Sequence, residues 1–452
     1  MDNIQINMPD DVKKIISILA ENGFEAYAVG GCVRDSLLGR NPDDWDVTTN
    51  ALPHQIKKIF MRTVDTGIKH GTVTVLFGNG AYEVTTYRID GKYTDNRHPD
   101  DVTFTASLEE DLKRRDFTIN AMAYNDENGL IDIFGARDDL LKKKIRCVGE
   151  AKERFLEDAL RMMRAVRFAA QLGFDIDKDT YNAISLLSKN ITNVSAERIC
   201  SELKKLLLSE NPQMIRLLYE SGITAHILPE FDIMMNTAQN NPHHIYSVGE
   251  HTIESLRFVK ADVVLRFAML LHDVGKPDTK KTDDKGMDHF CGHPMRGEKM
   301  ANNIMHRLKF DNITRKAVCR LVRWHDDRPP LSEVSIRKAI FKIGVEAYPD
   351  LFAIKRADML AQSTKWRAEK EAYIDEYEAI YNRIIKRGDC LSIKELKING
   401  TDIINLGETQ GRHIGDILSR ILEHVITKPE DNNREILLDM ARKFVNVYNK
   451  NK

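Results

Sequence analysis

Two aspartates and one glutamate in the first hundred residues have the types and spacing of a metal site. Asp44 and Asp46 lie two apart in a short run that predicts a strand, so both carboxylates should project from the same face. Glu83, the charged residue of another predicted strand, is the best placed third carboxylate. Magnesium favours oxygen ligands, and a metal pair lowers the pKa of an attacking hydroxyl group and neutralises a leaving pyrophosphate. The three residues therefore indicate a magnesium-dependent reaction at a phosphate.

A glycine pair, Gly30 and Gly31, lies between a predicted strand and a predicted helix, and Arg34 lies one turn inside that helix. Glycines at such a turn leave backbone amides accessible, and the helix start adds a partial positive charge, so both suit phosphate oxygens. By itself a Gly-Gly pair is usually a turn, and an Asp-x-Asp pair is usually a loop or a cap. Their order and spacing together favour a nucleotide site.

Five motifs in the first 170 residues occur in the order of a known family. They are Gly30-Gly31-Cys32-Val33-Arg34-Asp35, Asp44-Trp45-Asp46, Arg114-Arg115-Asp116-Phe117-Thr118-Ile119-Asn120-Ala121, Asp132-Ile133-Phe134-Gly135-Ala136-Arg137-Asp138-Asp139-Leu140 and Glu157-Asp158-Ala159-Leu160-Arg161. By these motifs the chain resembles the class II tRNA nucleotidyltransferases, which include bacterial CCA-adding enzymes and their poly(A) polymerase relatives. The resemblance implies that Asp44 and Asp46 bind Mg²⁺. It also implies that Arg115, Asp116 and Asn120 help to hold ribose and triphosphate, with tRNA, CTP and ATP as partners.

Selection between bases is expected from Asp158 and Arg161, which are three apart in a region that predicts a helix and so should share a face. Cytosine and adenine both present an amino donor beside a ring-nitrogen acceptor, whereas uracil and guanine present a carbonyl beside a ring N–H. An acceptor next to a donor therefore selects C and A. The resemblance implies that this pair is an amino-acid template, with Arg164 as a further contact.

Relatives in this family add CCA, only CC, only A, or a poly(A) tail. The segment from Tyr87 to Pro99 is similar to the loop that lets CCA enzymes switch from C to A, although His98 stands where a more basic residue is expected. We therefore expect CCA addition, with an A-adding enzyme or a poly(A) polymerase as the alternatives within the family. An RNA-binding protein with an inactive head is the alternative of another class.

A second set of metal ligands is predicted in the helical half of the chain. An adjacent His-Asp pair at the end of an apolar helix can bind a divalent transition metal that activates water against a phosphoester. The ordered set resembles the HD phosphohydrolase superfamily and comprises His251, His272, Asp273, His293, His325 and Asp358. His251 and Asp358 would complete a first metal site, His293 and His325 would hold a second metal, and His289 is left as a nearby surface residue. A third hypothesis makes this hydrolase the main activity and the head a nucleotide sensor.

The secondary structure expected from the sequence differs between the first third of the chain and the rest. Residues 1–145 read as mixed α/β, and from Glu150 onward strand signals nearly vanish. We expect an α/β nucleotidyltransferase head of the polymerase-β type with a mixed sheet, followed by an all-α neck, an HD domain and a helical tail. The expected limits are 1–145 for the head, 146–235 for the neck, 236–365 for the HD domain and 366–452 for a tail that binds tRNA.

The composition of the chain indicates which partners and which cellular compartment to expect. The formal net charge of −1 gives no global attraction to nucleic acid, so RNA contacts must come from local basic surface, such as the segment from Arg315 to Arg328. The six cysteines form no Cys-x-x-Cys pair, which fits reduced thiols better than a disulfide framework. No segment is apolar and long enough to span a membrane or to be a secretory signal. These features predict a cytoplasmic protein.

Overall fold

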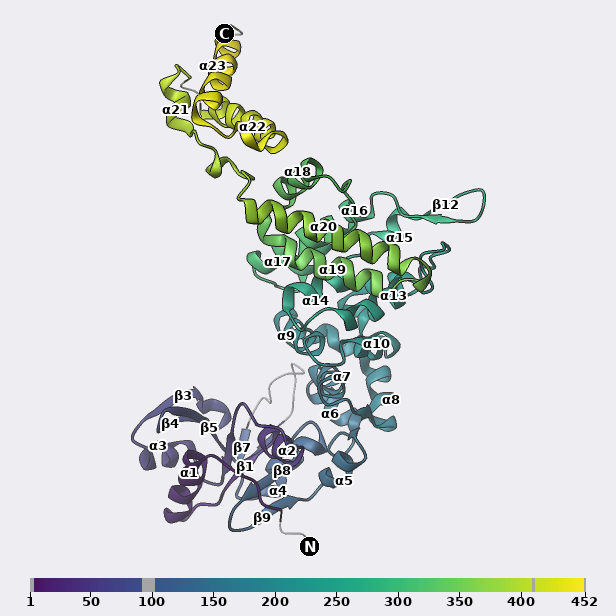
Figure 1. Ribbon diagram of the computed structural model, residues 1–452. Coiled ribbons are helices and arrows are strands. Elements are labelled where there is room, and N and C mark those ends of the chain that lie inside the picture. Colours follow the sequence, from purple (N-terminus) through teal and green to yellow (C-terminus); the bar gives the residue numbers. More distant parts are fainter. Residues whose placement is uncertain (1–3, 92–101, 409–410, 451–452) are drawn as a thin grey trace. The chain divides into compact units, whose positions relative to one another are not determined.

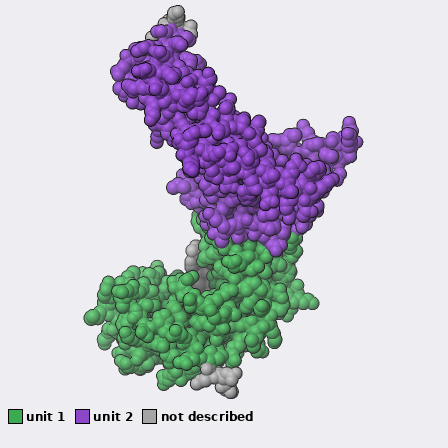
Figure 2. All heavy atoms as spheres, viewed as in Figure 1, with its two compact units in different colours: residues 1–232 green, residues 233–452 purple. Residues whose placement is uncertain are grey.

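The computed structural model describes residues 4–91, 102–408 and 411–450. The chain forms two compact units, Met1–Asp232 and Ile233–Lys452, coloured green and purple in Figure 2. Most of the segment expected to switch between C and A, including His98, lies outside the described residues. The finer division into head, neck, HD domain and tail stays a prediction.

A seven-stranded sheet in the order β3-β4-β5-β2-β1-β8-β9 organises unit 1 (Figure 1). Only β2 and β5 are parallel neighbours in it; the other pairs are antiparallel, so the expected mixed sheet is confirmed. The strands of this sheet are β1 (Ala26–Val29), β2 (Asp46–Thr49), β3 (Thr63–Gly67), β4 (Thr72–Phe77), β5 (Gly80–Thr86), β8 (Met122–Asn125) and β9 (Gly129–Asp132). Shorter two-stranded ladders are β6 (Arg88–Asp90) with β7 (Val102–Phe104), and β10 (Lys144–Ile145) with β11 (Asp175–Ile176).

Strand β1, which lies between β2 and β8 in the sheet, is buried along its whole length, and helices pack against it. Helix α1 (Asp10–Glu21) buries Val12, Ile15 and Leu19, which recur at helical spacing, and it contacts β1. The other helices of the sheet region are α2 (Gly31–Leu37), α3 (Pro53–Ile59), α4 (Leu108–Lys113) and α5 (Ala136–Leu141). A helical region follows with α6 (Ala151–Glu157), α7 (Leu160–Leu172), α8 (Lys178–Leu187), α9 (Ala196–Leu207), α10 (Ile215–Glu220) and α11 (Thr224–Ile227), and α12 (Pro229–Met235) contains the division between the units.

In the part of unit 2 that the structure describes, the strands are those of the ladder of β12 (Lys281–Thr282) and β13 (Asp288–His289), and the other regular elements are helices. Its first helices are α13 (Val248–Ser255), α14 (Val263–Leu271), α15 (Lys276–Thr279), α16 (His293–Arg307), α17 (Asn312–Trp324), α18 (Glu333–Ile343), α19 (Tyr348–Leu360) and α20 (Arg367–Arg387). The remaining helices, α21 (Gly400–Asn405), α22 (Gly411–Thr427) and α23 (Arg434–Lys450), enclose an apolar cluster that includes Ile403, Ile421 and Leu437. Helix α14 is almost entirely buried, so the residues at its end are held rigidly. No helix among the described residues has the length and apolarity needed to cross a bilayer.

Candidate active site and metal centre

Asp46 and Glu83 lie side by side on the two parallel strands of the sheet. Val47 of β2 pairs with Val84 of β5, so the residue that precedes each of them projects from the same face. Asp44, which the sequence predicted to be on the strand, lies two residues before its start. The physical reason is that the pairing of β2 with β1 begins only at Asp46, opposite Val29, so Asp44 precedes the paired residues.

The charges around Asp46 fit a cation site. The Asp46 side chain is exposed to solvent but is also partly desolvated by surrounding protein atoms, and this desolvation raises its pKa. The negative charges of Glu83 and Asp44 raise the pKa of Asp46 further, whereas the positive charge of Arg115 lowers it. A divalent cation would relieve that like-charge repulsion. Among the described residues, the groups of three ligand atoms within 4.8 Å of one another lie in unit 2, so the head carboxylates are less tightly gathered.

A fully buried carboxylate, Asp111 on α4, holds the arginines of the third motif in place. It accepts hydrogen bonds from Arg114 Nη2 at 2.8 Å, Arg115 Nη2 at 3.4 Å and Thr48 Oγ1 at 3.1 Å. Arg115 also passes close to Gly30, where an added Cβ would lie 3.1 Å from Arg115 Nη1 and where φ is +85°. The sequence prediction missed Asp111, although an acid four residues before an arginine on a helix is a usable signal.

Four of the predicted nucleotide-binding residues form one hydrogen-bonded network, in which Arg34, Asp116 and Asn120 are buried and Arg164 is partly exposed. Arg34 Nη1 donates to Asn120 Oδ1 at 2.6 Å, Asn120 Nδ2 donates to Asp116 Oδ1 at 3.1 Å, and Arg164 Nε donates to Asp116 Oδ2 at 2.8 Å. Burial alone would raise the pKa of Asp116, but Arg164 and the Asn120 hydrogen bond lower it well below its usual value. Asp116 is therefore ionised at neutral pH and fixes both side chains.

Asp158 and Arg161 do not share one helix, contrary to the sequence prediction. Helix α6 ends at Glu157, Asp158 is extended with φ −139° and ψ 103°, and α7 begins at Leu160. Asp158 Oδ2 accepts from Arg198 Nη2 at 2.7 Å, whereas Arg161 Nη1 donates to Glu157 Oε2 at 2.5 Å. The two side chains thus belong to the same break between helices, but each is bound to another partner.

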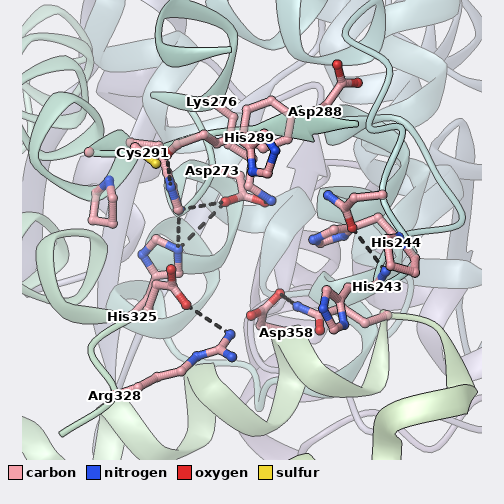
Figure 3. A pocket seen from close by; sticks show the side chains of 18 of the residues that line it. His243, His244, Asp273, Lys276, Asp288, His289, Cys291, His325, Arg328 and Asp358 are labelled. Carbon is pink, nitrogen blue, oxygen red and sulfur yellow. Dashed lines mark hydrogen bonds and ion pairs between the residues drawn. The ribbon is translucent and has the colours of Figure 1, made fainter. Parts of the chain in front are cut away.

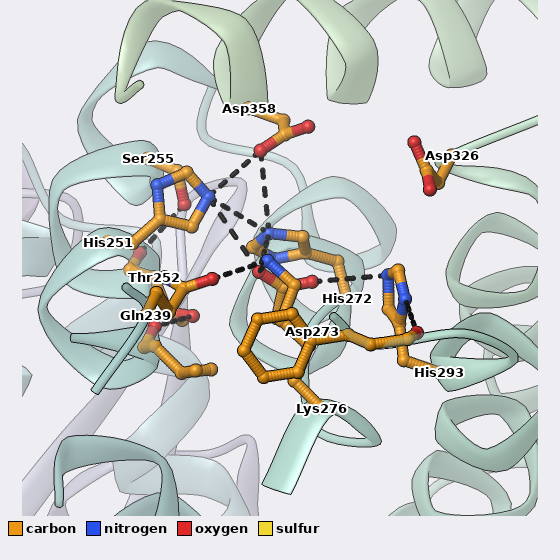
Figure 4. Close-up of polar contacts among 12 residues, drawn as sticks. Gln239, His251, Thr252, Ser255, His272, Asp273, Lys276, His293, Asp326 and Asp358 are labelled. Carbon is orange, nitrogen blue, oxygen red and sulfur yellow. Dashed lines mark hydrogen bonds and ion pairs between the residues drawn. The ribbon is translucent and has the colours of Figure 1, made fainter. Parts of the chain in front are cut away.

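The six predicted ligands of the second site come from five helices or helix ends of unit 2, as Figure 4 shows for five of them. His251 lies on α13, and His272 and Asp273 directly follow α14. The others are His293, the first residue of α16, His325, the residue after α17, and Asp358 on α19. Asp273 belongs to two groups of close ligand atoms, one with His251 and His272, the other with His293 and His325.

The histidines face one another through Nε2. The Nε2 atoms of His251 and His272 are 3.4 Å apart, and those of His293 and His325 are 3.2 Å apart. Their Nδ1 atoms lie within 2.8 Å of the backbone oxygens of Met269 (for His272), Phe290 (for His293) and Val322 (for His325). Donation of the Nδ1 proton to these carbonyls directs the Nε2 lone pair into the site, which is the arrangement of metal-ligating histidines.

Asp273 and Asp358 supply the negative charge of this centre. Asp273 Oδ2 is 3.2 Å from His272 Nε2, its Oδ1 is 3.5 Å from His293 Nε2, and Asp358 Oδ1 is 2.8 Å from His251 Nε2. Burial would raise the pKa of Asp273, but His272 and Lys276 lower it well below the usual value. With their Nδ1 protons donated to backbone oxygens, His293 and His325 have Nε2 lone pairs that face each other at 3.2 Å and repel unless a proton or a cation lies between them. These two histidines with Asp273 therefore fit one metal ion, and His251, His272 and Asp273 form a second group of close ligand atoms that fits another.

A cavity of about 460 Å³ opens on this centre (Figure 3). Its wall includes Lys276, whose Nζ is 2.7 Å from Asp273 Oδ2, and Arg328, neither of which the sequence analysis assigned to this site. His244 was also missed; burial and Lys276 lower its pKa to about 2, and its ring packs edge-on against His251. His289 is exposed and paired with Asp283, as expected for a surface residue. It nevertheless lines the cavity.

Three family models match the chain. They are described as "Poly A polymerase head domain" for residues 26–146, "Probable RNA and SrmB- binding site of polymerase A" for residues 173–235, and "tRNA nucleotidyltransferase domain 2 putative" for residues 292–441. The first covers the carboxylates of the head, and the third covers His293, His325 and Asp358.

Whole-length relatives are similar to this chain. A CCA-adding enzyme of Geobacillus thermodenitrificans is 51% identical over 93% of both chains, and one of Ligilactobacillus salivarius is 36% identical over 97% of this chain and 98% of its own. Among solved structures, the Bacillus stearothermophilus CCA-adding enzyme in complex with CTP matches with a TM-score of 0.73 at 29% identity, covering 98% of this chain and 100% of that one. A Thermotoga maritima CCA-adding enzyme complexed with tRNA shares the fold, with a TM-score of 0.58 at 21% identity.

Proposed function

The chain belongs to the CCA-adding enzymes, and from this premise we propose that it adds CMP, CMP and AMP from CTP and ATP to the 3′ end of tRNA without a nucleic-acid template. The observation that carries the proposal is the adjacency of Asp46 and Glu83 on parallel strands, with Asp44 close enough to raise the pKa of Asp46. Enzymes of this family use divalent metal ions, and we propose Mg²⁺ for this head because the candidate ligands are all carboxylates.

Different residues of the head would have different roles in nucleotidyl transfer. Asp44, Asp46 and Glu83 would hold the ions, which lower the pKa of the RNA 3′ hydroxyl and neutralise the leaving pyrophosphate. Arg115, which Asp111 orients toward Asp46, is placed to bind triphosphate oxygens. Asp116 keeps Arg164 and Asn120 in fixed positions beside the same site.

Choice of C and A would depend on the break between α6 and α7. Asp158 accepts two hydrogen bonds, from Leu160 N and Arg198 Nη2, and an ionised carboxylate has about four acceptor positions. Acceptor capacity therefore remains for an exocyclic amino group. Arg161, held by Glu157, would supply the donor for the ring nitrogen.

Product sequencing tests the main proposal. tRNA that lacks three, two or one of its terminal nucleotides is incubated with CTP, ATP and Mg²⁺, and the 3′ ends are read. Completion to CCA from all three substrates supports the proposal. Addition of A alone to the substrate that ends in CC would assign an A-adding enzyme, long A tails would assign a poly(A) polymerase, and binding without addition would assign an inactive head.

A second activity is supported by the histidine and aspartate centre of unit 2. We propose that it is a metal-dependent phosphohydrolase site, because five of its six residues are buried and Asp273 can bridge two ions. Metal content measured before and after His272→Ala tests the site without any assumption about its substrate. Loss of bound transition metal in the variant supports the proposal, and an unchanged content contradicts it.

The location of the enzyme is proposed on chemical grounds. The six cysteines are all free thiols in the structure, and five of them are buried. This is the state expected in a reducing compartment, so we propose the cytoplasm.

A further inference from the structure

The buried ring of Phe168, on helix α7, lies among three guanidinium groups. The Cζ atom of Arg167 lies 3.9 Å from the ring centroid, that of Arg34 5.1 Å and that of Arg164 5.4 Å. The face of an aromatic ring carries partial negative charge and attracts a cation within about 6 Å of its centroid, most strongly where water is excluded. Phe168 is 6% exposed, and the ring of Phe117 packs against it with the centroids 5.8 Å apart, so little water weakens this attraction.

Each of the three arginines also has an acidic partner of its own. The pairs are Arg34–Asp35 at 2.8 Å, Arg164–Asp116 at 2.6 Å and Arg167–Glu202 at 2.6 Å. Burial would lower the pKa of Arg164, but nearby acids, of which Asp116 acts most strongly, raise it. Burial lowers the pKa of Arg167, Glu202 raises it, and the charge of Arg164 lowers it again, so the guanidinium groups repel one another despite their partners. A ring among them offsets this repulsion and keeps them close together.

The ring of Phe168 connects two parts of the proposed nucleotide site. Arg34 lies on α2, the helix that follows the glycine pair, whereas Arg164 and Phe168 lie four apart on α7. Both helices are labelled in Figure 1. Helix α7 begins two residues after Asp158, the residue proposed to read the base. A change in the ring would therefore affect groups from the phosphate end and from the base end of the site.

Arg164 keeps a donor for a ligand. Its Nε and Nη2 atoms lie 2.8 and 2.6 Å from Asp116 Oδ2, while its Nη1 has no hydrogen-bond partner among the residues that the structure describes. The Arg164 side chain is 34% exposed, so this donor is accessible to a nucleotide. Phe168 itself is too buried to touch a nucleotide, and its effect on one must pass through the arginines.

We propose that Phe168 is a positioning residue for nucleotide addition, whose ring holds Arg34 and Arg164 where they receive the incoming nucleoside triphosphate. The proposal rests on the proposed function, because CTP and ATP are the substrates of that reaction. Both nucleotides would use the same arginines. Weakening the attraction of the ring for cations should therefore weaken the binding of both.

Fluorinated phenylalanines separate the charge distribution of the ring from its shape. Mono-, di- and trifluorophenylalanine in place of Phe168 withdraw electron density from the ring face in steps, with little change in volume. The control is the same series in place of Phe155, a fully buried residue of α6 that has no cation over its ring in the described part of the chain. Binding of CTP is measured by calorimetry without tRNA, and KM and kcat are measured for CTP and for ATP.

The affinity for CTP should fall with each fluorine added at Phe168, on the order of tenfold for the trifluoro variant, because desolvated cation–π contacts are weakened. KM for both nucleotides should rise in parallel while kcat stays within about twofold, since the arginines act on binding. The series at Phe155 should keep the wild-type affinity. Packing alone predicts no trend at Phe168, or a lower kcat with an unchanged KM; either result would overturn the proposal, as would an equal fall in affinity in the Phe155 series.

The role of Phe168 and the catalytic proposal fail in different ways. If the wild type binds CTP but adds no nucleotide, the catalytic proposal is refuted, while the fluorine series still decides the role of the ring. If the wild type completes CCA and the series at Phe168 shows no trend, only the role of Phe168 is refuted.

Discussion

Replacing Asp111 with Asn should damage both the stability of unit 1 and nucleotide addition. The Asp111 carboxylate is fully buried and accepts from Arg114, Arg115 and Thr48. The amide of Asn keeps the shape but loses the charge, so two guanidinium groups lose their buried counter-charge. Removing one partner of a buried ion pair costs about 3 to 5 kcal/mol, and the arginine side chains are less than a fifth exposed, so a cost of about 3 kcal/mol is expected.

Hydrogen exchange of peptides from β1, β2 and β8 measures this cost within unit 1, without contributions from unit 2. The matched control is Asp138→Asn, whose carboxylate is exposed and 3.9 Å from Lys142, so its effect should stay within about 0.5 kcal/mol. Because Arg115 would no longer be held toward Asp46, kcat/KM for CTP should fall on the order of 10²-fold. A variant with wild-type exchange and wild-type kinetics would refute the role of Asp111 as a positioning residue.

The contribution of the Asp111–arginine interaction to stability should depend on pH. Burial would raise the pKa of Asp111, but Arg114 and Arg115 lower it below the usual value of 3.8. A carboxyl with a depressed folded-state pKa stabilises the fold above its unfolded pKa, and that stability is lost as the pH falls through the folded pKa. The stability gap between wild type and Asp111→Asn should therefore be constant near neutral pH and narrow below about pH 4.

Three further changes test other parts of the structure. Asp46→Ala should abolish nucleotide addition in a primer-extension assay while tRNA still binds, because the proposed metal ions of the head lose a central ligand; full activity would contradict the metal assignment. Asp158→Ala should admit UTP or GTP about 10-fold to 100-fold more readily, since mismatched buried polar groups cost about 1 to 3 kcal/mol each; unchanged selectivity would mean that another group reads the base. Lys355→Met should lower the metal content of unit 2 relative to Lys386→Met, because the buried Lys355 Nζ donates to the backbone oxygens of His325 and Asp327, and equal metal content would contradict this.

The head could be predicted in outline because its signals are local. Alternation placed Glu83 within a strand, and the glycine pair marked the turn before α2. The limits of β2 could not be predicted, since they depend on where β1 stops pairing with it. The break at Asp158 was hidden because the apolar period continues from Phe155 to Leu160, so the sequence reads as one helix.

For the metal centre of unit 2, the sequence could predict the types of the ligands but not their geometry. The ligand types were readable, because His-Asp at the end of an apolar helix is a local pattern. The facing Nε2 atoms of His293 and His325 depend on α16 beginning, and α17 ending, at the same place, and that convergence is set by packing between helices. His244 reaches His251 through a tertiary contact that no local pattern encodes. Lys276, in contrast, lies three residues after Asp273, so its ion pair is a local contact that the spacing could have indicated.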